Sequence, residues 1–206
     1  LESNGALTIE ALMSQATIDE APRYGIRWRM DSEFSNIRYY GRGPWENYCD
    51  RKDGAMMSIY SCDVKDMYIP YVRPQENGHR VDVQWLEILN DKGKGLVIYA
   101  MSGKENSEKG DNYFEFNTLH NSVEDFDCEE SDAPYQWNNF VENDPHDIGR
   151  ARNVMKKQTH VSDISPRDFT EVCIDSRMTG VGGDNSWGAE TYDKYKVLTS
   201  EPQRLV

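Results

Sequence analysis

The segment from Met178 to Trp187, Met-Thr-Gly-Val-Gly-Gly-Asp-Asn-Ser-Trp, combines residue types that can hold a sugar. An indole ring offers an apolar surface to one face of a pyranose, while nearby amides and carboxylates bind the hydroxyl groups. Three glycines, Gly180, Gly182 and Gly183, leave the backbone free to adopt positive φ and predict a shaped turn. Trp187 lies outside any alternating pattern, which suggests a large ring presented by a loop, and one interpretation is that it contacts a ligand. The alternative is that it anchors the loop to the core, because tryptophan is highly buried on average.

No catalytic set is visible among the other reactive side chains. The sequence lacks the G-x-S-x-G, H-E-x-x-H and phosphate-loop patterns. Its four histidines are scattered singly and are expected to be surface or core residues: His79, His120, His146 and His160. Glycoside hydrolysis needs two carboxylates about 5 to 10 Å apart. With 36 acidic residues, spacing along the chain cannot locate such a pair.

Metal ligation is not indicated either. The four cysteines show no C-x-x-C spacing and are expected to be ordinary thiols: Cys49, Cys62, Cys128 and Cys173. The acidic run from Glu124 to Asp132 could ligate Ca²⁺, but it lacks the spacing and the central glycine of an EF-hand loop. A solvated acidic face is the expected interpretation, and no metal site is assigned to this chain.

The charge balance excludes several classes of partner. A net charge of −13 disfavours nucleic acids and anionic membrane surfaces, whereas sugars remain compatible with it. The sequence contains no run of about 18 apolar residues, the length needed to span a membrane. The N-terminal sequence has no initiating Met and no signal-like pattern, so we expect a piece of a longer polypeptide. We expect a soluble protein, and its compartment, cytoplasm or periplasm, is left open.

The hydrophobic pattern is mostly of period two, which is typical of strands. Alternating or apolar strands are predicted at residues 7–11, 26–30, 81–88, 96–101, 113–116, 169–174 and 195–198. The 81–88 pattern changes face at Leu86, which indicates a bulge or a turning edge. The run at 96–101 is expected to be covered on both faces. Turns are predicted at 41–44, 53–54, 77–78, 91–95 and 182–183. These features predict an all-β antiparallel sandwich over residues 1–206.

One region departs from the strand pattern. From about residue 124 to 157 the chain is acidic and then polar, and it ends in a basic cluster. We interpret it as a surface insertion between strands. Just before it, Ser122 to Asp125 has the form of a helix capping box.

Three blocks resemble a known family. The first is Gly41-Arg-Gly-Pro-Trp-Glu-Asn-Tyr-Cys-Asp-Arg51, which is similar to the G-x-G-P-x-E-N-Y-x-D-R signature of large glycoside hydrolase family 2 β-galactosidases. Asp66 to Gly78 resembles the block that follows it in that family, and residues 178–187 resemble its M-G-x-G-G-D-D-S-W segment. The blocks occur in family order and cover roughly residues 21–187 apart from the insertion.

The resemblance implies the C-terminal, or small-chain, domain of the enzyme. Its fold is a large antiparallel supersandwich of the galactose-mutarotase type, here truncated at its N-terminus because the family domain begins upstream. Such truncation would leave an unpaired edge, and homo-oligomerisation is left open. The family's catalytic glutamates and its Mg²⁺ and Na⁺ sites lie on a separate TIM barrel, so no cofactor and no catalytic residue is expected in this chain.

For the site, the resemblance implies that Trp187 forms an apolar wall for the galactoside. The residues expected to shape its loop are Gly182, Gly183, Asp184, Asn185 and Ser186, with Asn185 where the family often has Asp. The residues expected to have a structural role, including a buried Arg–carboxylate pair, are Glu46, Asn47, Asp50, Arg51, Glu76 and Asn77.

The leading hypothesis is a non-catalytic domain of a retaining β-galactosidase that cleaves terminal β-D-galactosides such as lactose. Its partners would be the galactoside and the TIM barrel of the same polypeptide. Two alternatives remain open: an autonomous galactoside-binding, lectin-like module, and an assembly element. A mutarotase-like activity rests on fold analogy alone and would need a His–carboxylate pair that the sequence does not reveal.

Overall fold

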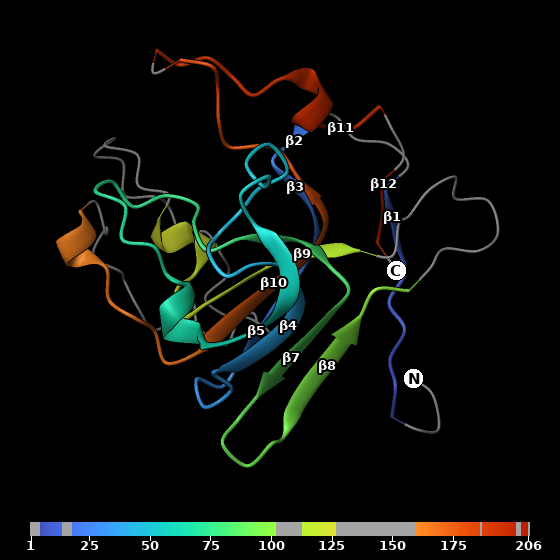
Figure 1. Ribbon diagram of the computed structural model, residues 1–206, viewed down its shortest axis with the longest axis vertical. Helices are drawn as coiled ribbons and strands as arrows, with labels where there is room; N and C mark the ends of the chain where they lie inside the picture. Colours follow the sequence, from blue (N-terminus) through green and yellow to red (C-terminus); the bar gives the residue numbers. More distant parts are fainter. Residues whose placement is uncertain are drawn as a thin grey trace, which may run out of the picture. The chain divides into compact units, whose positions relative to one another are not determined.

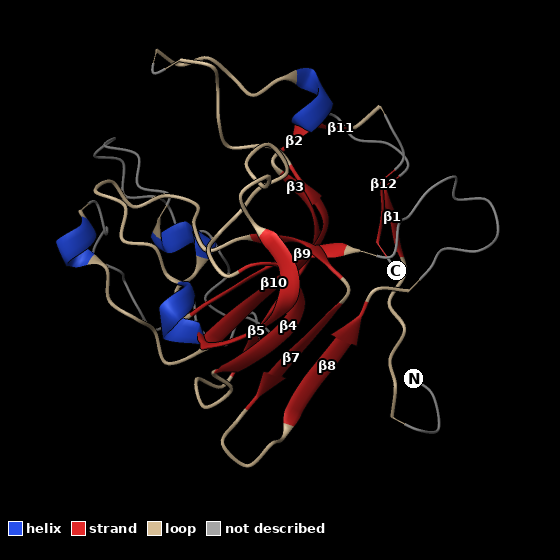
Figure 2. Ribbon diagram, in the orientation of Figure 1, coloured by secondary structure: helices blue, strands red, loops and turns tan. Residues whose placement is uncertain are grey.

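Strands and short 3-10 helices make up the regular structure of the described residues (Figure 1, Figure 2). The computed structural model describes residues 5–13, 18–101, 113–126, 160–185, 187–200 and 203–205. The chain divides into two compact units. The first combines Leu1–Ile69, Asn77–Asn121 and Arg167–Val206, and the second combines Pro70–Glu76 with Ser122–Pro166.

The first unit contains a four-stranded antiparallel sheet in the order β3–β10–β9–β6. Its strands are β3 (Arg23–Met30), β10 (Thr170–Met178), β9 (Phe114–Leu119) and β6 (Arg80–Val83). The strands predicted at 26–30, 113–116 and 169–174 are therefore confirmed. Every position of β9 is buried, and β10 and β6 pair along its two edges. Its polar residues Glu115 and Asn117 must consequently find partners inside the protein.

A second antiparallel sheet has the order β5–β4–β7–β8. Its strands are β5 (Met56–Asp63), β4 (Asn36–Gly43), β7 (Trp85–Leu89) and β8 (Gly95–Tyr99). The turn predicted at residues 41–44 is wrong in part, because Gly41 and Gly43 continue β4. A side chain at Gly43 would overlap the Tyr39 hydroxyl and the Tyr60 ring. Glycine is needed there for close packing within a strand rather than for a turn.

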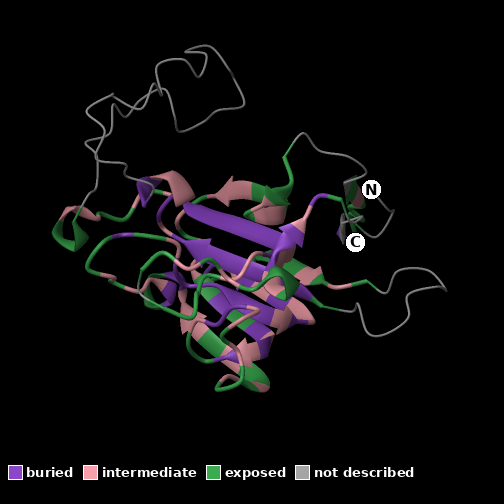
Figure 3. Ribbon diagram, turned by 90° about the horizontal axis from the view of Figure 1, so that it is seen from above, coloured by how far each residue is buried: buried purple, intermediate pink, exposed green. Residues whose placement is uncertain are grey.

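The two sheets pack against each other and enclose the core, which confirms the antiparallel sandwich. Tyr39 of β4 meets Phe116 of β9 edge to face, with ring centroids 5.1 Å apart. Buried apolar residues come from both sheets and include Ile37, Leu86, Ile88, Val81, Val83, Phe114, Val172 and Ile174. In Figure 3 the buried stretches, drawn in purple, run through the central strands.

The change of face near Leu86 marks the point where the chain crosses between the sheets. β6 pairs with β9 in one sheet, whereas β7 pairs with β4 in the other. The register of β6 against β9 is irregular between Arg80 and Val83, and Asp82 has a φ of 55°. The period-two pattern therefore signals a turning strand, as interpreted from the sequence.

Two further strand predictions hold only in part. The strand predicted at 96–101 is present as β8, but it pairs with β7 alone among the described strands and its residues are largely exposed, so the expectation that it is covered on both faces is wrong. The strand predicted at residues 7–11 is limited to β1 (Ala11–Met13), which pairs with β12 (Gln203–Leu205). Leu7 and Ile9 are exposed and pair with no described strand. A further short pair joins β2 (Glu20–Ala21) to β11 (Val197–Leu198).

The 3-10 helices are single turns: η1 (Val64–Met67), η2 (Val123–Asp125), η4 (Val161–Asp163) and η5 (Asp193–Tyr195). In the second unit, η2 has the capping box predicted from the sequence, because Asp125 accepts from the Ser122 amide and Ser122 from the Glu124 amide. Most of the predicted insertion, residues 127–157, lies outside the described residues.

Candidate functional site

A long loop joins the end of β10 to η5 and presents Trp187. The loop closes at its base, where the Gly180 amide donates to the Tyr195 carbonyl at 2.9 Å. The Trp187 side chain is 93% exposed, so the alternative that it anchors the loop to the core is wrong for this structure. The ring is available to pack against a partner or ligand.

Polar contacts shape the tip of the loop. The Asn185 side-chain oxygen accepts from the Trp187 amide at 2.7 Å, and Asp184 accepts from the Tyr192 hydroxyl at 3.3 Å. An aspartate at position 185 would offer the same acceptor, so the departure from the family pattern preserves this contact. Ser186 lies outside the described residues.

The glycines of the loop serve a purpose other than the one predicted. Gly180, Gly182 and Gly183 do not adopt positive φ; Gly188, directly after Trp187, does so at 88°. A Cβ at Gly183 would overlap the Ala189 carbonyl, and one at Gly180 would lie 2.5 Å from the Asp50 carboxylate. Here glycine allows close approach between chain segments rather than an unusual backbone conformation.

The first sequence block holds this loop through Asp50. Its Oδ2 atom accepts from the Gly182 amide at 2.8 Å and from the Thr191 hydroxyl at 3.2 Å. The neighbouring Cys49 thiol donates to the carbonyl of Met178 at 3.3 Å. Burial, with smaller contributions from Glu115 and Asp50, raises the pKa of Cys49 to about 11, which keeps it a protonated donor at neutral pH. Blocks far apart in sequence thus meet at the base of the Trp187 loop.

The expected Arg–carboxylate pair forms between Arg51 and Glu46, 2.6 Å apart, but it is only half buried. The Glu46 side chain is 8% exposed and that of Arg51 is 55% exposed. The second oxygen of Glu46 accepts from the Gly78 amide at 2.8 Å. The pair therefore joins the first sequence block to the second, and Asp50 is not the carboxylate involved.

Two asparagines complete that junction. Asn47 accepts from the Val81 amide and donates to the carbonyls of Arg42 and Trp45. Asn77 accepts from the Ile69 amide at 3.0 Å. Both side chains are buried, and their hydrogen bonds to main-chain groups satisfy their own polar atoms inside the protein. Glu76 is half buried in the second unit, and its role stays a prediction.

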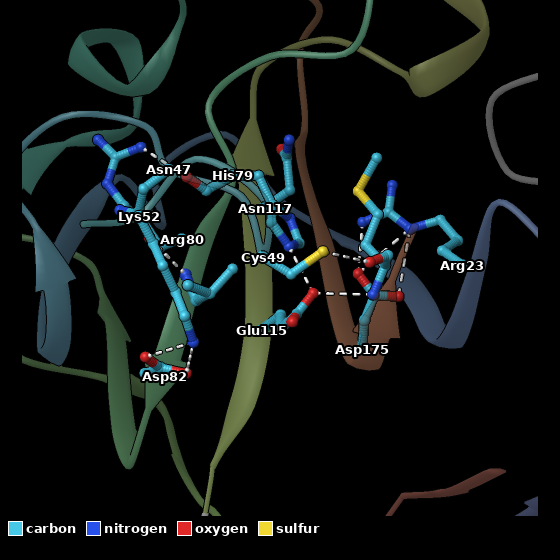
Figure 4. A network of polar contacts seen from close by, with 12 residues as sticks. Arg23, Asn47, Cys49, Lys52, His79, Arg80, Asp82, Glu115, Asn117 and Asp175 are labelled. Atoms are coloured by element: carbon cyan, nitrogen blue, oxygen red, sulfur yellow. Dashed lines mark hydrogen bonds and ion pairs between the residues drawn. The ribbon is translucent and has the colours of Figure 1, made fainter. Parts of the chain in front are cut away.

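The structure also reveals a buried His–carboxylate pair that sequence reasoning missed (Figure 4). His79 Nε2 lies 2.9 Å from Glu115 Oε2, which also accepts from the Met178 amide at 2.8 Å. His79 is fully buried and stacks on Tyr48 at a centroid distance of 5.3 Å. A substrate cannot reach this pair, so it is a structural contact and offers no support for a mutarotase-like reaction.

Other charged groups, one buried and one half buried, are also held by specific partners. Arg80 donates to the Tyr39 hydroxyl and to main-chain carbonyls, including that of Pro44 at 2.6 Å. The Asp82 carboxylate contacts Arg42 and Lys52 at 2.5 and 2.9 Å. Burial alone would raise the pKa of Asp82, but the hydrogen bonds and charges of these two cations outweigh it and lower the pKa.

The far limb of the Trp187 loop is held by charges. Lys196 Nζ lies 2.8 Å from Glu190 and 2.9 Å from Glu20, and these carboxylates raise its pKa.

Among the described residues, no group of three or more His, Cys, Asp or Glu side chains could hold a metal ion. The same part of the chain contains no helix long and apolar enough to cross a bilayer.

Comparison with known proteins decides the family. Residues 1–205 match the family described as beta galactosidase small chain. The chain belongs to this family. The small-chain domain is similar to the beta-galactosidase of Priestia megaterium, with 33% identity over 201 residues that cover 97% of this chain and 16% of that protein.

Other relatives show the same relationship. The beta-galactosidase of Streptococcus thermophilus is 26% identical over 191 residues, covering 93% of this chain and 15% of that protein. That of Lactobacillus delbrueckii subsp. bulgaricus is 29% identical over 184 residues, covering 89% and 14%. The small-chain domain thus spans only about a seventh of the length of these relatives.

Proposed function

We propose that this small-chain domain is the non-catalytic C-terminal domain of a retaining β-galactosidase that hydrolyses terminal β-D-galactosides such as lactose. It contributes Trp187 as an apolar wall to an active site whose catalytic residues and Mg²⁺ and Na⁺ sites lie on a separate TIM-barrel domain. The single observation that carries this proposal is an almost fully exposed tryptophan on a loop that is hydrogen-bonded to the sandwich. The family and the names of the relatives support the choice of galactoside.

An exposed indole ring at the loop tip has a clear physical role in such a site. Packing one face of a sugar against a tryptophan contributes about 1 kcal/mol beyond the area buried. Two charged residues near the loop make contacts that hold it: Asp50 accepts a hydrogen bond from Gly182, and Lys196 forms an ion pair with Glu190. The described part of the loop therefore supplies binding surface and shape.

The test compares the complete polypeptide that contains this chain with its Trp187→Ala and Trp187→Phe variants. We expect alanine to raise KM for an aryl galactoside about five- to tenfold, and phenylalanine to restore much of the loss. An unchanged KM in Trp187→Ala would reject the proposed contact. The purified 206-residue chain should not hydrolyse the same substrate; hydrolysis abolished by changing one carboxylate would overturn its non-catalytic role.

An autonomous galactoside-binding module is the second candidate, and the exposure of Trp187 favours it as well. A galactose titration of the isolated chain, followed by tryptophan fluorescence, separates the two. Saturable binding that is lost in Trp187→Ala would establish an independent module. No binding up to high millimolar sugar would leave Trp187 as one wall of a site completed elsewhere.

A further inference from the structure

We infer that Asp50 is the positioning residue for Trp187, because its carboxylate holds both limbs of the loop that presents the indole. This inference rests on the proposed function for its meaning in substrate binding. Its geometric part, a tether between residue 50 and the loop, stands on the structure alone.

The position of the Trp187 ring is not fixed by packing of the ring itself. The side chain is 93% exposed, so packing contributes little to its orientation. The position of the ring must follow from the backbone that carries it. What holds the backbone on each side of residue 187 therefore decides where the indole is presented.

Both limbs converge on one oxygen atom. Gly182 lies five residues before Trp187 and Thr191 lies four residues after it, and both donate to Oδ2 of Asp50. These are the hydrogen bonds of the Asp50 carboxylate within the described residues, where its Oδ1 is buried and has no partner. Both hydrogen bonds that the Asp50 carboxylate makes within the described residues therefore go to the Trp187 loop.

Asp50 is itself held in place by the sandwich. The Arg51 amide donates to the Tyr48 carbonyl at 2.8 Å, which closes a tight turn around Asp50. Cys49, the residue before Asp50, donates to the carbonyl of Met178 at the end of β10. The carboxylate is therefore a fixed point rather than a flexible surface group.

Gly180 is the steric complement of this tether. It lies just before the loop, and a Cβ there would come within 2.6 Å of the Asp50 carboxyl carbon. This Cβ would also come within 2.7 Å of the Thr191 hydroxyl, so a methyl group at position 180 would disturb both the carboxylate and its Thr191 donor without removing the charge. Gly180→Ala is consequently a second route to the same defect, independent of any change at residue 50.

The first experiment measures the tether directly by hydrogen exchange of the peptides covering residues 181–191 in Asp50→Ala, Asp50→Asn and Gly180→Ala. Asp53→Ala is the matched control, because Asp53 is an exposed carboxylate three positions away that makes no hydrogen bond or ion pair to the described part of the loop. We expect at least about tenfold faster exchange in Asp50→Ala and Gly180→Ala, a smaller change in Asp50→Asn, which keeps an acceptor, and none in Asp53→Ala. Unchanged exchange in both Asp50→Ala and Gly180→Ala would overturn the inference.

The second experiment asks whether Asp50 acts through Trp187, using the complete polypeptide and a double-mutant cycle. We expect Asp50→Ala to raise KM about two- to fivefold with little change in kcat, and to add nothing in a Trp187→Ala background. Additive effects on KM would overturn the positioning role even if the loop loosens. If the proposed function is wrong, Trp187→Ala alone will leave KM unchanged. The hydrogen-exchange experiment would still show whether Asp50 holds the loop.

Discussion

His79 and Glu115 form a closed pair in the core of the sandwich, with 2.9 Å between Nε2 and Oε2. Glu115 lies on β9, between β6 and β10 in the sheet, and His79 directly precedes β6. The same oxygen of Glu115 accepts from the amide of Met178, the last residue of β10. One carboxylate thus links three neighbouring segments, ending at the strand from which the Trp187 loop departs.

Removing this carboxylate should be costly. Glu115→Ala leaves the His79 ring and the Met178 amide buried without their acceptor, so we expect a loss of about 3 kcal/mol in the free energy of unfolding. Glu115→Gln retains an acceptor and should lose clearly less. Urea unfolding provides the measurement. The control is Glu87→Ala, which removes the more exposed Arg38 pair at 3.5 Å and should cost no more than about 0.5 kcal/mol. Equal losses at positions 87 and 115 would contradict a special role for the buried pair.

Trp187 should be dispensable for folding. Because its side chain is almost fully exposed, Trp187→Ala should change the free energy of unfolding by less than about 0.5 kcal/mol. Trp28→Ala is the matched control, since Trp28 is half buried on β3 and should lose about 2 kcal/mol or more. The same urea series measures both. A large loss at Trp187 would mean that the ring packs against the protein and is not reserved for a ligand.

The sequence predicted those parts of the fold whose signal is local. β3 and β10 alternate or run apolar within one segment, and both were found. β4 was missed although Ile37 and Tyr39 alternate with exposed residues, because Gly41 and Gly43 suggested a turn. Whether a glycine ends a strand or makes room for a neighbouring ring depends on Tyr60, which belongs to another strand. That information is not local.

The same distinction applies to the site. An exposed loop around Trp187 could be predicted from its glycines and polar residues. The link from Asp50 to Gly182 could not, because 132 residues separate them and no pattern near either residue signals the other. The exposure of β8 was also hidden, since an apolar run does not reveal which strand lies at the edge of a sheet.

Asp82 should make stability depend on acid pH. Its pKa is lowered from the model-peptide value of 3.8 by Arg42 and Lys52, despite the opposing effect of burial. A lowered pKa in the folded state gives stability that is fully present above the unfolded value and lost as the pH falls through the folded one. We expect Asp82→Asn to lower the free energy of unfolding by about 1 kcal/mol at pH 7. As the pH falls below about 4, the variant should lose less of its remaining stability than the unmodified chain.

Asparagine suits this test because it tolerates the φ of 55° found at residue 82. Urea unfolding at a series of pH values between about 3 and 7 gives the comparison. Asp53→Asn is the charge-matched control, since no described cation contacts that exposed carboxylate. If both variants followed the same pH profile, the Arg42 and Lys52 contacts would not be the origin of the dependence.

The open edge of β8 should govern self-association of the isolated chain. β8 pairs only with β7 among the described strands, and it exposes Leu96, Val97 and Tyr99. A charged residue on such an edge opposes pairing with another strand. We expect Val97→Lys to change stability by less than about 0.5 kcal/mol and to shift the chain toward monomer in sedimentation experiments over a range of concentrations. Ile59→Lys, on the opposite edge strand β5, is the matched control. Association unchanged by Val97→Lys but abolished by Ile59→Lys would assign the contact to β5 instead.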